Sequence, residues 1–218
     1  MMFSLCNALC FLMFLFVVPL ECKSEGYEPA SNCSTVECPP YVVIYSQKEF
    51  EIRSYKEALW VSGPKILNTS FVPAFPNAIL TLDAYYGGKN VQHVKIDKTA
   101  PIFVDVQPAL YYVQNTTYTA NYYVPKRYQN GIPTPLSPEI KPVKLPKYKY
   151  AAVNRITFGL LDDAIFLGLT ALKRSLQGTP YQRAATFNQV TVVTYNPYSP
   201  NDPSINSDGF NEVLVWFD

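Results

Sequence analysis

The sequence predicts an α+β fold in which an antiparallel sheet curls toward a barrel and carries two helices. Three observations lead to this prediction. The order strands, helix, strands occurs twice, over residues ~41–124 and ~139–217. Each half contains one stripe of apolar residues at helical spacing. The other apolar runs are short and bounded by turn residues. Because each half alone is near the lower size limit for an independent core, we expect a single domain over residues 41–218.

The first half combines five expected strands with one helix. A helix with Pro76 in its first turn ends at Gly87-Gly88. Its apolar stripe consists of Phe75, Ala78, Ile79, Leu82, Tyr85 and Tyr86. The expected strands are Tyr41–Tyr45, Phe50–Tyr55, Leu59–Ser62, residues 94–106 and Tyr118–Val124.

The second half repeats this order after a proline-rich connector, Pro125–Pro142, which should be extended. A second helix is expected over Leu160–Leu176. Asp162 and Asp163 in its first turn favour the helix dipole, as do Lys173 and Arg174 in its last. The expected strands are Ile140–Leu145, Tyr148–Ile156, Gln189–Tyr195 and Glu212–Phe217.

The N-terminus predicts export. The apolar run Leu9–Leu20 resembles the core of a signal peptide, and we expect residues 1–24 to be removed. Residues 25–40 then form an N-terminal arm in which Cys33 and Cys38 should form a disulfide, as two close thiols do in an oxidising compartment. A metal site at this pair would need further Cys or His ligands, which the rest of the mature chain does not supply.

Three acceptor sequences for N-glycosylation, at Asn32, Asn68 and Asn115, agree with a secreted glycoprotein. We expect an extracellular location, with the vacuole as an alternative, and no membrane span once the leader is removed. The formal net charge of +1, with acids and bases mixed along the chain, gives no electrostatic footprint for nucleic acid.

Few residues are available for catalysis or metal binding. His93 is the only histidine, so a zinc or copper site built from several imidazoles is excluded, and no Gly-x-Ser-x-Gly sequence accompanies it. We interpret His93 as a structural residue at the start of a strand. Asp97 and Asp105 are expected on one strand in solvated positions. We therefore expect neither catalytic residues nor a protein metal site. The 17 tyrosines suit cross-strand packing or a surface for a flat ligand.

Several separated segments resemble the SOUL, or haem-binding protein, family. They occur in order from residue 41 to residue 218 and are Phe50–Tyr55 with Leu59–Val61, Tyr85–Asn90, Lys95–Pro101, Tyr122–Gln129, Ala151–Gly159, Leu176–Thr179, Tyr195–Pro197 and Asn211–Val213. The resemblance implies two pseudo-symmetric halves that form a distorted antiparallel β-barrel with two packed helices. It also implies non-covalent binding of haem or another tetrapyrrole in an apolar site, without catalysis.

The resemblance places this site around the first helix, with Phe75, Ile79, Leu82 and Tyr86 as candidate contacts. Some family members are thought to ligate iron with a histidine directly after Glu-Ile-Arg, where this chain has Ser54. Candidates that remain for the iron are Tyr55 and His93, and the alternative is water. The candidates for the propionates are Arg53, Lys89 and Lys95. The family's Arg-Asn-Glu is altered to Phe210-Asn-Glu212.

The sequence thus predicts a secreted, non-enzymatic protein that binds haem or a related tetrapyrrole. The alternative is an extracellular module that has lost haem binding and binds another hydrophobic ligand or a partner protein through its tyrosine-rich surface. An enzyme on this scaffold is the third and weakest hypothesis.

Overall fold

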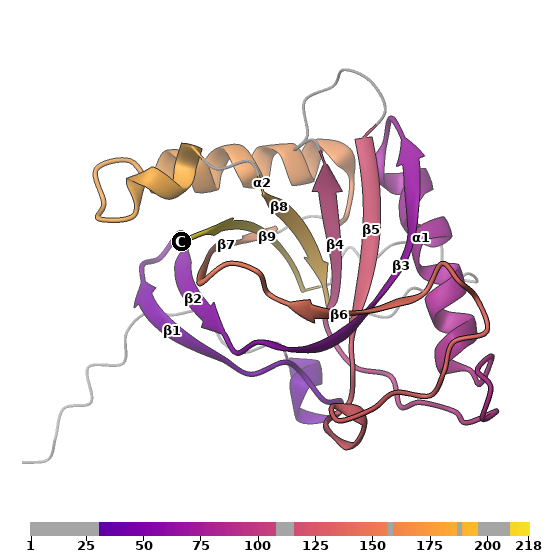
Figure 1. Ribbon diagram of the computed structural model, residues 1–218. Helices are drawn as coiled ribbons and strands as arrows, with labels where there is room; N and C mark the ends of the chain where they lie inside the picture. Colours follow the sequence, from indigo (N-terminus) through magenta and orange to yellow (C-terminus); the bar gives the residue numbers. More distant parts are fainter. Residues whose placement is uncertain (1–30, 108–115, 157–158, 187–188, 196–209) are drawn as a thin grey trace, which may run out of the picture.

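The computed structural model describes residues 31–107, 116–156, 159–186, 189–195 and 210–218. Within them, nine strands form one curled sheet with antiparallel neighbours, and two helices lie on its convex outer face (Figure 1). This arrangement confirms the predicted α+β barrel-like fold. The strands are β1 (Tyr41–Ser46), β2 (Glu51–Tyr55), β3 (Ala58–Asn68), β4 (Ile102–Gln107), β5 (Thr116–Tyr123), β6 (Lys141–Leu145), β7 (Tyr150–Ile156), β8 (Val190–Thr194) and β9 (Asn211–Phe217).

The two helices are α1 (Phe71–Tyr86) and α2 (Asp162–Ser175). Of the helices in the described ranges, none has the length and apolar character needed to cross a membrane. The path β3-α1-β4-β5 is repeated by β7-α2-β8-β9, which accounts for the internal repeat in the sequence.

Each half extends the part of the sheet that the other half forms. The order across the sheet is β1-β2-β7-β9-β8-β4-β5-β3-β6. Within it, β3-β5-β4 of the first half mirrors β7-β9-β8 of the second. However, β2 from the first half pairs with β7, and β6 from the second half pairs with β3. Neither half completes its own sheet, so the two halves depend on each other for folding.

Both faces of the sheet are buried, because side chains alternate along each strand and each face has its own cover. The outer face packs against α1 and α2, whose apolar stripes form one core with it. The inner face encloses a lumen with a second apolar cluster, and all seven residues of β9 are buried. The inner cluster consists of Tyr55, Trp60, Ala100, Phe103, Tyr123, Ala151, Val153, Val193, Tyr195, Leu214 and Trp216.

A buried ion cluster ties β2 to β9 inside the lumen. The Arg53 guanidinium donates from Nη1 and Nη2 to the two carboxylate oxygens of Glu212, at 2.9 and 2.8 Å, and from Nε to Glu51 at 2.7 Å. Tyr195 Oη also donates to Glu212 at 3.2 Å. Arg53 and Glu51 are each 1% exposed and Glu212 is 0% exposed. This bidentate geometry is the strong form of a charge-assisted hydrogen bond.

The first helix begins at Phe71, so Pro76 lies inside it and not in its first turn as expected. The N-terminus of α1 is capped by a residue from another part of the chain. Asp162 accepts hydrogen bonds from the backbone N–H of Phe71, at 2.7 Å, and from Ser70 Oγ, at 2.6 Å. The carboxylate thus satisfies a free N–H group at the helix start and places negative charge at the positive end of the dipole. Phe71 stacks on Phe75.

The expected strand over residues 94–106 is shorter in the structure, because residues 94–101 form no strand. The Asn90 side chain accepts from the Val94 N–H at 3.0 Å and donates to the Val94 carbonyl at 2.7 Å. These bonds occupy the backbone groups that a strand would pair. His93 lies in this turn with a φ of 54°, and not at the start of a strand.

The N-terminal arm closes one end of the lumen. Cys33 and Cys38 form the predicted disulfide, with their Cα atoms 5.6 Å apart. Both cysteines pack against the inner cluster. The backbone of Glu37 pairs with that of Thr99, and its side chain accepts from the N–H of Lys126 at 2.6 Å. The expected leader, residues 1–24, lies outside the described residues.

Of the glycosylation candidates, Asn68 ends β3 and is half-buried. Its Oδ1 accepts from the N–H groups of Thr69 and Ser70. Asn115 and the side chain of Asn32 lie outside the described residues.

Replacing Gly63 by Ala should lower the free energy of unfolding by about 1–3 kcal/mol, the usual cost of overpacking a core. A Cβ at Gly63 on β3 would lie 2.9 Å from the Ala78 carbonyl oxygen and 3.2 Å from Leu82 of α1. Gly131→Ala is the matched control, because a Cβ there meets nothing within 4 Å. Urea denaturation checks both variants, and equal stabilities would contradict the close approach of helix and sheet.

Replacing Arg53 by Met should cost about 3–5 kcal/mol, because it leaves the Glu212 and Glu51 carboxylates buried without their cation. The control is Lys144→Met, which removes one partner of the exposed Lys144–Glu57 pair and should cost at most about 1 kcal/mol. The same denaturation measurement compares them. A loss below about 1 kcal/mol for Arg53→Met would show that the buried cluster does not hold the lumen together.

Candidate functional site

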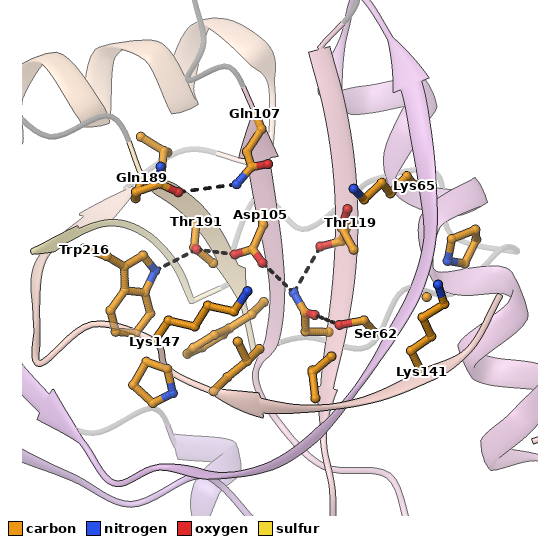
Figure 2. Close-up of a pocket in the computed structure, with 18 of the residues that line it drawn as sticks. Ser62, Lys65, Asp105, Gln107, Thr119, Lys141, Lys147, Gln189, Thr191 and Trp216 are labelled. Atoms are coloured by element: carbon orange, nitrogen blue, oxygen red, sulfur yellow. Dashed lines mark hydrogen bonds between the residues drawn. The ribbon is translucent and has the colours of Figure 1, made fainter. Parts of the chain in front are cut away.

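A cavity of about 750 Å³ opens from the lumen at the end opposite the N-terminal arm. One wall is the inner face of β3, β5, β4, β8 and β9, and the other is β6 with the turn that follows it (Figure 2). We call this cavity the lumen pocket. Its lining comprises Ser62, Gly63, Pro64, Lys65, Phe103, Asp105, Gln107, Thr119, Asn121, Pro138, Glu139, Lys141, Val143, Leu145, Pro146, Lys147, Tyr148, Gln189, Val190, Thr191 and Trp216.

A chain of hydrogen bonds crosses the floor of the lumen pocket, with one residue from each of five neighbouring strands (Figure 2). Trp216 Nε1 donates to Thr191 Oγ1 at 2.8 Å, and Thr191 Oγ1 donates to Asp105 Oδ1 at 2.6 Å. Asn121 Nδ2 donates to Asp105 Oδ2 at 3.0 Å, and the Ser62 hydroxyl donates to Asn121 Oδ1. The chain fixes the orientation of every group in it.

Asp105 is the acceptor at the centre of this chain. Burial raises the pKa of its carboxyl group, while the hydrogen bonds from Thr191 and Asn121 and the charge of Lys147 act in the opposite direction. Asp105 makes no ion pair within the described part of the chain. The expectation that Asp97 and Asp105 lie on one strand is wrong, and Asp105 is half-buried. Asp105 lies on the lumen face of β4, whereas Asp97 precedes the strand and is exposed.

The rim of the lumen pocket is basic, and its walls are partly apolar. Lys65, Lys141 and Lys147 are exposed lining residues, with Glu139 as the one acid on the rim. The apolar part of the lining comes from Phe103, Val143, Leu145, Pro146, Tyr148, Val190 and Trp216. Three ammonium groups above an aromatic and aliphatic interior suit a flat, largely apolar ligand that carries carboxylates at one edge.

The lining fits the organic part of haem better than its iron. No histidine, cysteine or methionine is among the described lining residues, and Tyr148 supplies their only phenol. Across the described ranges, no three His, Cys, Asp or Glu side chains are grouped to hold a metal ion. The macrocycle and its propionates therefore have complementary partners here, whereas of the usual side-chain ligands of haem iron only the Tyr148 phenol is present.

The four apolar candidates on α1 do not form an exposed surface. Phe75, Ile79, Leu82 and Tyr86 are between 0% and 2% exposed, because the stripe faces the sheet. Tyr86 Oη also donates to the Tyr123 carbonyl at 2.8 Å. In this structure they are core residues, and a ligand would reach them only if α1 moved away from the sheet.

The candidates on β2 are divided between the two faces of the sheet. Arg53 and Tyr55 point into the lumen, where Arg53 Nη1 donates to Tyr55 Oη at 3.3 Å. Because its guanidinium already binds two buried carboxylates, Arg53 is not available to a propionate here. Ser54 points to the outer face, and its hydroxyl donates to the Lys149 carbonyl at 3.2 Å.

His93, Lys89 and Lys95 are exposed on the segment after α1, and none of them lines the lumen pocket. The predicted site residues are therefore not brought together at one place. Sequence reasoning missed the residues that do converge, Asp105, Asn121 and Thr191. Their alternation with apolar neighbours along predicted strands was the available signal.

Replacing Asp105 by Asn should raise the free energy of unfolding at pH 7. Because burial raises the pKa of this carboxyl, the folded protein keeps its proton to higher pH than the unfolded chain does. Stability is therefore lost as pH rises from the unfolded pKa of about 3.9 through the folded value, and it stays lost at neutral pH. A flip of the Asn121 amide preserves its hydrogen bonds to residue 105 and to Ser62, since Ser62 can accept as well as donate, and gives up only the longer bond from Asn121 Nδ2 to the Thr119 carbonyl, at 3.2 Å.

Urea denaturation as a function of pH measures this effect. The gain should disappear below about pH 4, near the unfolded pKa. Asp97→Asn, at an exposed ion pair with Arg127, is the control and should change stability by at most about 1 kcal/mol. An Asp105→Asn protein that is less stable than wild type at pH 7 would contradict the assignment.

Comparison with known proteins agrees with the fold. The family model described as "SOUL heme-binding protein" matches residues 36–216. Heme-binding protein 2 of Homo sapiens is 32% identical over 91 residues, which cover 42% of this chain and 44% of the human protein. Heme-binding protein 2 of Mus musculus is 31% identical over the same coverage. The chain thus matches less than half the length of each relative. Because the family model spans most of the chain, the protein belongs to the SOUL haem-binding protein family.

Proposed function

We propose that this protein is a non-enzymatic binder of haem or a related tetrapyrrole, and that the ligand enters the lumen pocket. The observation that carries the proposal is the basic rim formed by Lys65, Lys141 and Lys147 around a partly aromatic cavity. The volume of about 750 Å³ is in the range of small-molecule and cofactor sites, about 300–1,000 Å³. The names of the two matched relatives, both heme-binding proteins, point to the same ligand class.

Each part of the lumen pocket has a separate role in this proposal. Phe103 and Trp216 provide apolar contact deep in the cavity, and the turn after β6 covers one side of it. The three lysines bind the propionates as exposed point charges, so this part of the affinity is sensitive to salt. When haem is bound, its iron supplies a centre for axial ligands and redox chemistry. The residues of this chain hold the macrocycle and exclude water from it.

We further propose that the protein acts after export. The apolar run Leu9–Leu20 and the Cys33–Cys38 disulfide support this, because such bonds persist in oxidising compartments. In this setting the protein would bind its ligand outside the cytosol, extracellularly or in a vacuole, with N-glycans at the acceptor asparagines.

Titration with hemin should quench Trp216 fluorescence in a saturable 1:1 manner and shift the Soret band. The chain has two tryptophans, so the titration uses Trp60→Phe, which leaves Trp216 as the reporter. Replacing Lys65, Lys141 and Lys147 together by Gln should weaken binding by about ten-fold, since exposed ion pairs contribute about 0.2–1 kcal/mol each.

The matched control is the pair Lys89→Gln and Lys95→Gln, which removes exposed cations beyond α1. If the Lys89→Gln and Lys95→Gln pair weakens hemin binding and the rim-lysine substitutions do not, the ligand binds near α1 and not in the lumen pocket. A flat difference spectrum together with unchanged fluorescence would contradict tetrapyrrole binding. A thermal-shift gain with other apolar ligands alone would then favour the module that has lost haem binding.

A further inference from the structure

Asp105 presents hydrogen-bonding capacity to the lumen pocket that the protein does not use. Each of its oxygens accepts one hydrogen bond, from Thr191 and from Asn121. An ionised carboxylate offers about four acceptor positions. Both donors are neutral, and the described residues place no ion pair on Asp105. A carboxylate in such a setting is costly unless a donor or a cation completes its shell.

The lining does not supply the missing donor at the floor of the cavity. Its lysines are exposed at the rim, and the charge of Lys147 acts on Asp105 only at a distance beyond an ion pair. The other floor residues are committed to one another through the same chain of hydrogen bonds, from Trp216 to Ser62. A ligand that presents an N–H donor or a protonated nitrogen at the floor would supply this group.

We infer that the preferred ligand of the lumen pocket is an open-chain tetrapyrrole, whose pyrrole N–H edge binds Asp105 while its carboxylates reach the rim lysines. This inference rests on the proposed function and narrows its ligand class. In haem, every pyrrole nitrogen is bonded to iron, and in a metal-free porphyrin the N–H groups point to the ring centre. When the ring is open, the side of the molecule that carries the N–H groups is no longer enclosed. A side-chain carboxylate can then reach these donors.

The chemistry of the lining supports the same ligand independently. Its described residues contain neither imidazole, thiolate nor thioether, so a ligand without iron loses little in this cavity. The acceptor at the floor and the cations at the rim form an amphoteric site. An open-chain tetrapyrrole has the complementary arrangement, with nitrogen donors in the body of the molecule and carboxylates on its edge.

The test compares biliverdin with hemin on the purified protein, by quenching of Trp216 and by the circular dichroism induced in the visible bands of bound biliverdin. The expected Kd for biliverdin is at least about ten-fold lower than that for hemin. Asp105→Asn should raise the Kd of biliverdin by about ten-fold or more, as for loss of a hydrogen bond to a charged group. The same variant should change the Kd of hemin by less than about three-fold.

Three further arms separate the contributions. Asp97→Asn makes the same chemical change at an exposed position and should affect neither ligand. Biliverdin dimethyl ester, which keeps the N–H edge but lacks the acids, should remain sensitive to Asp105→Asn and insensitive to the rim lysines. Asp105→Ser removes the carboxyl without adding an amide, and it replaces Asp105→Asn if that variant does not fold.

Each outcome bears on the inference. Hemin binding as tight as biliverdin binding, or equal losses of both ligands in Asp105→Asn, overturns the inference and leaves the proposed function standing. Failure of both tetrapyrroles to bind the wild-type protein overturns the proposed function as well.

Discussion

The ion pair between Arg53 and Glu212 is the contact on which the lumen depends. It joins two strands that lie on either side of β7 and come from opposite halves of the chain, 159 residues apart. The pairing of β2 with β7 joins a strand of the first half to the second half. The ion pair stabilises this arrangement from the lumen side of the sheet. Because the cation binds two carboxylates, any register other than the observed one would leave buried charge uncompensated. The cluster and the N-terminal arm lie toward one end of the lumen, and among the described residues a cavity of about 750 Å³ opens toward the other end.

The sheet has two buried faces with different chemistry, and this difference decides where a ligand can bind. The outer face is covered by α1 and α2. Apolar helix residues such as Ile79 and Leu82 are buried between helix and sheet and are not accessible to a ligand. The inner face encloses the lumen, where side chains leave a cavity of about 750 Å³. There, polar groups such as Asp105 and Asn121 alternate with Phe103 along the strands and remain available to a ligand.

Local patterns in the sequence were sufficient for the elements and the fold class. The helix stripes, the dipole charges of α2 and the disulfide arise within short segments, and each was predicted. The start of α1 could not be predicted, because Asp162 supplies its cap from 91 residues away. The floor of the lumen pocket could not be predicted for the same reason, because its residues meet only through long-range contacts. Asp105 meets Thr191 only through the pairing of β4 with β8, and a single aspartate in an exposed strand has the same local sequence.

Position 54 is separated from the proposed tetrapyrrole site by the thickness of the sheet. Ser54 lies on the outer face of β2, whereas Arg53 and Tyr55 point into the lumen. A ligand held by a histidine at position 54 would therefore contact the outside of the sheet and could not touch Asp105. Position 54 and the floor of the lumen pocket lie on opposite faces of the sheet. A tetrapyrrole bound at the floor of the lumen pocket would therefore need no side chain from position 54.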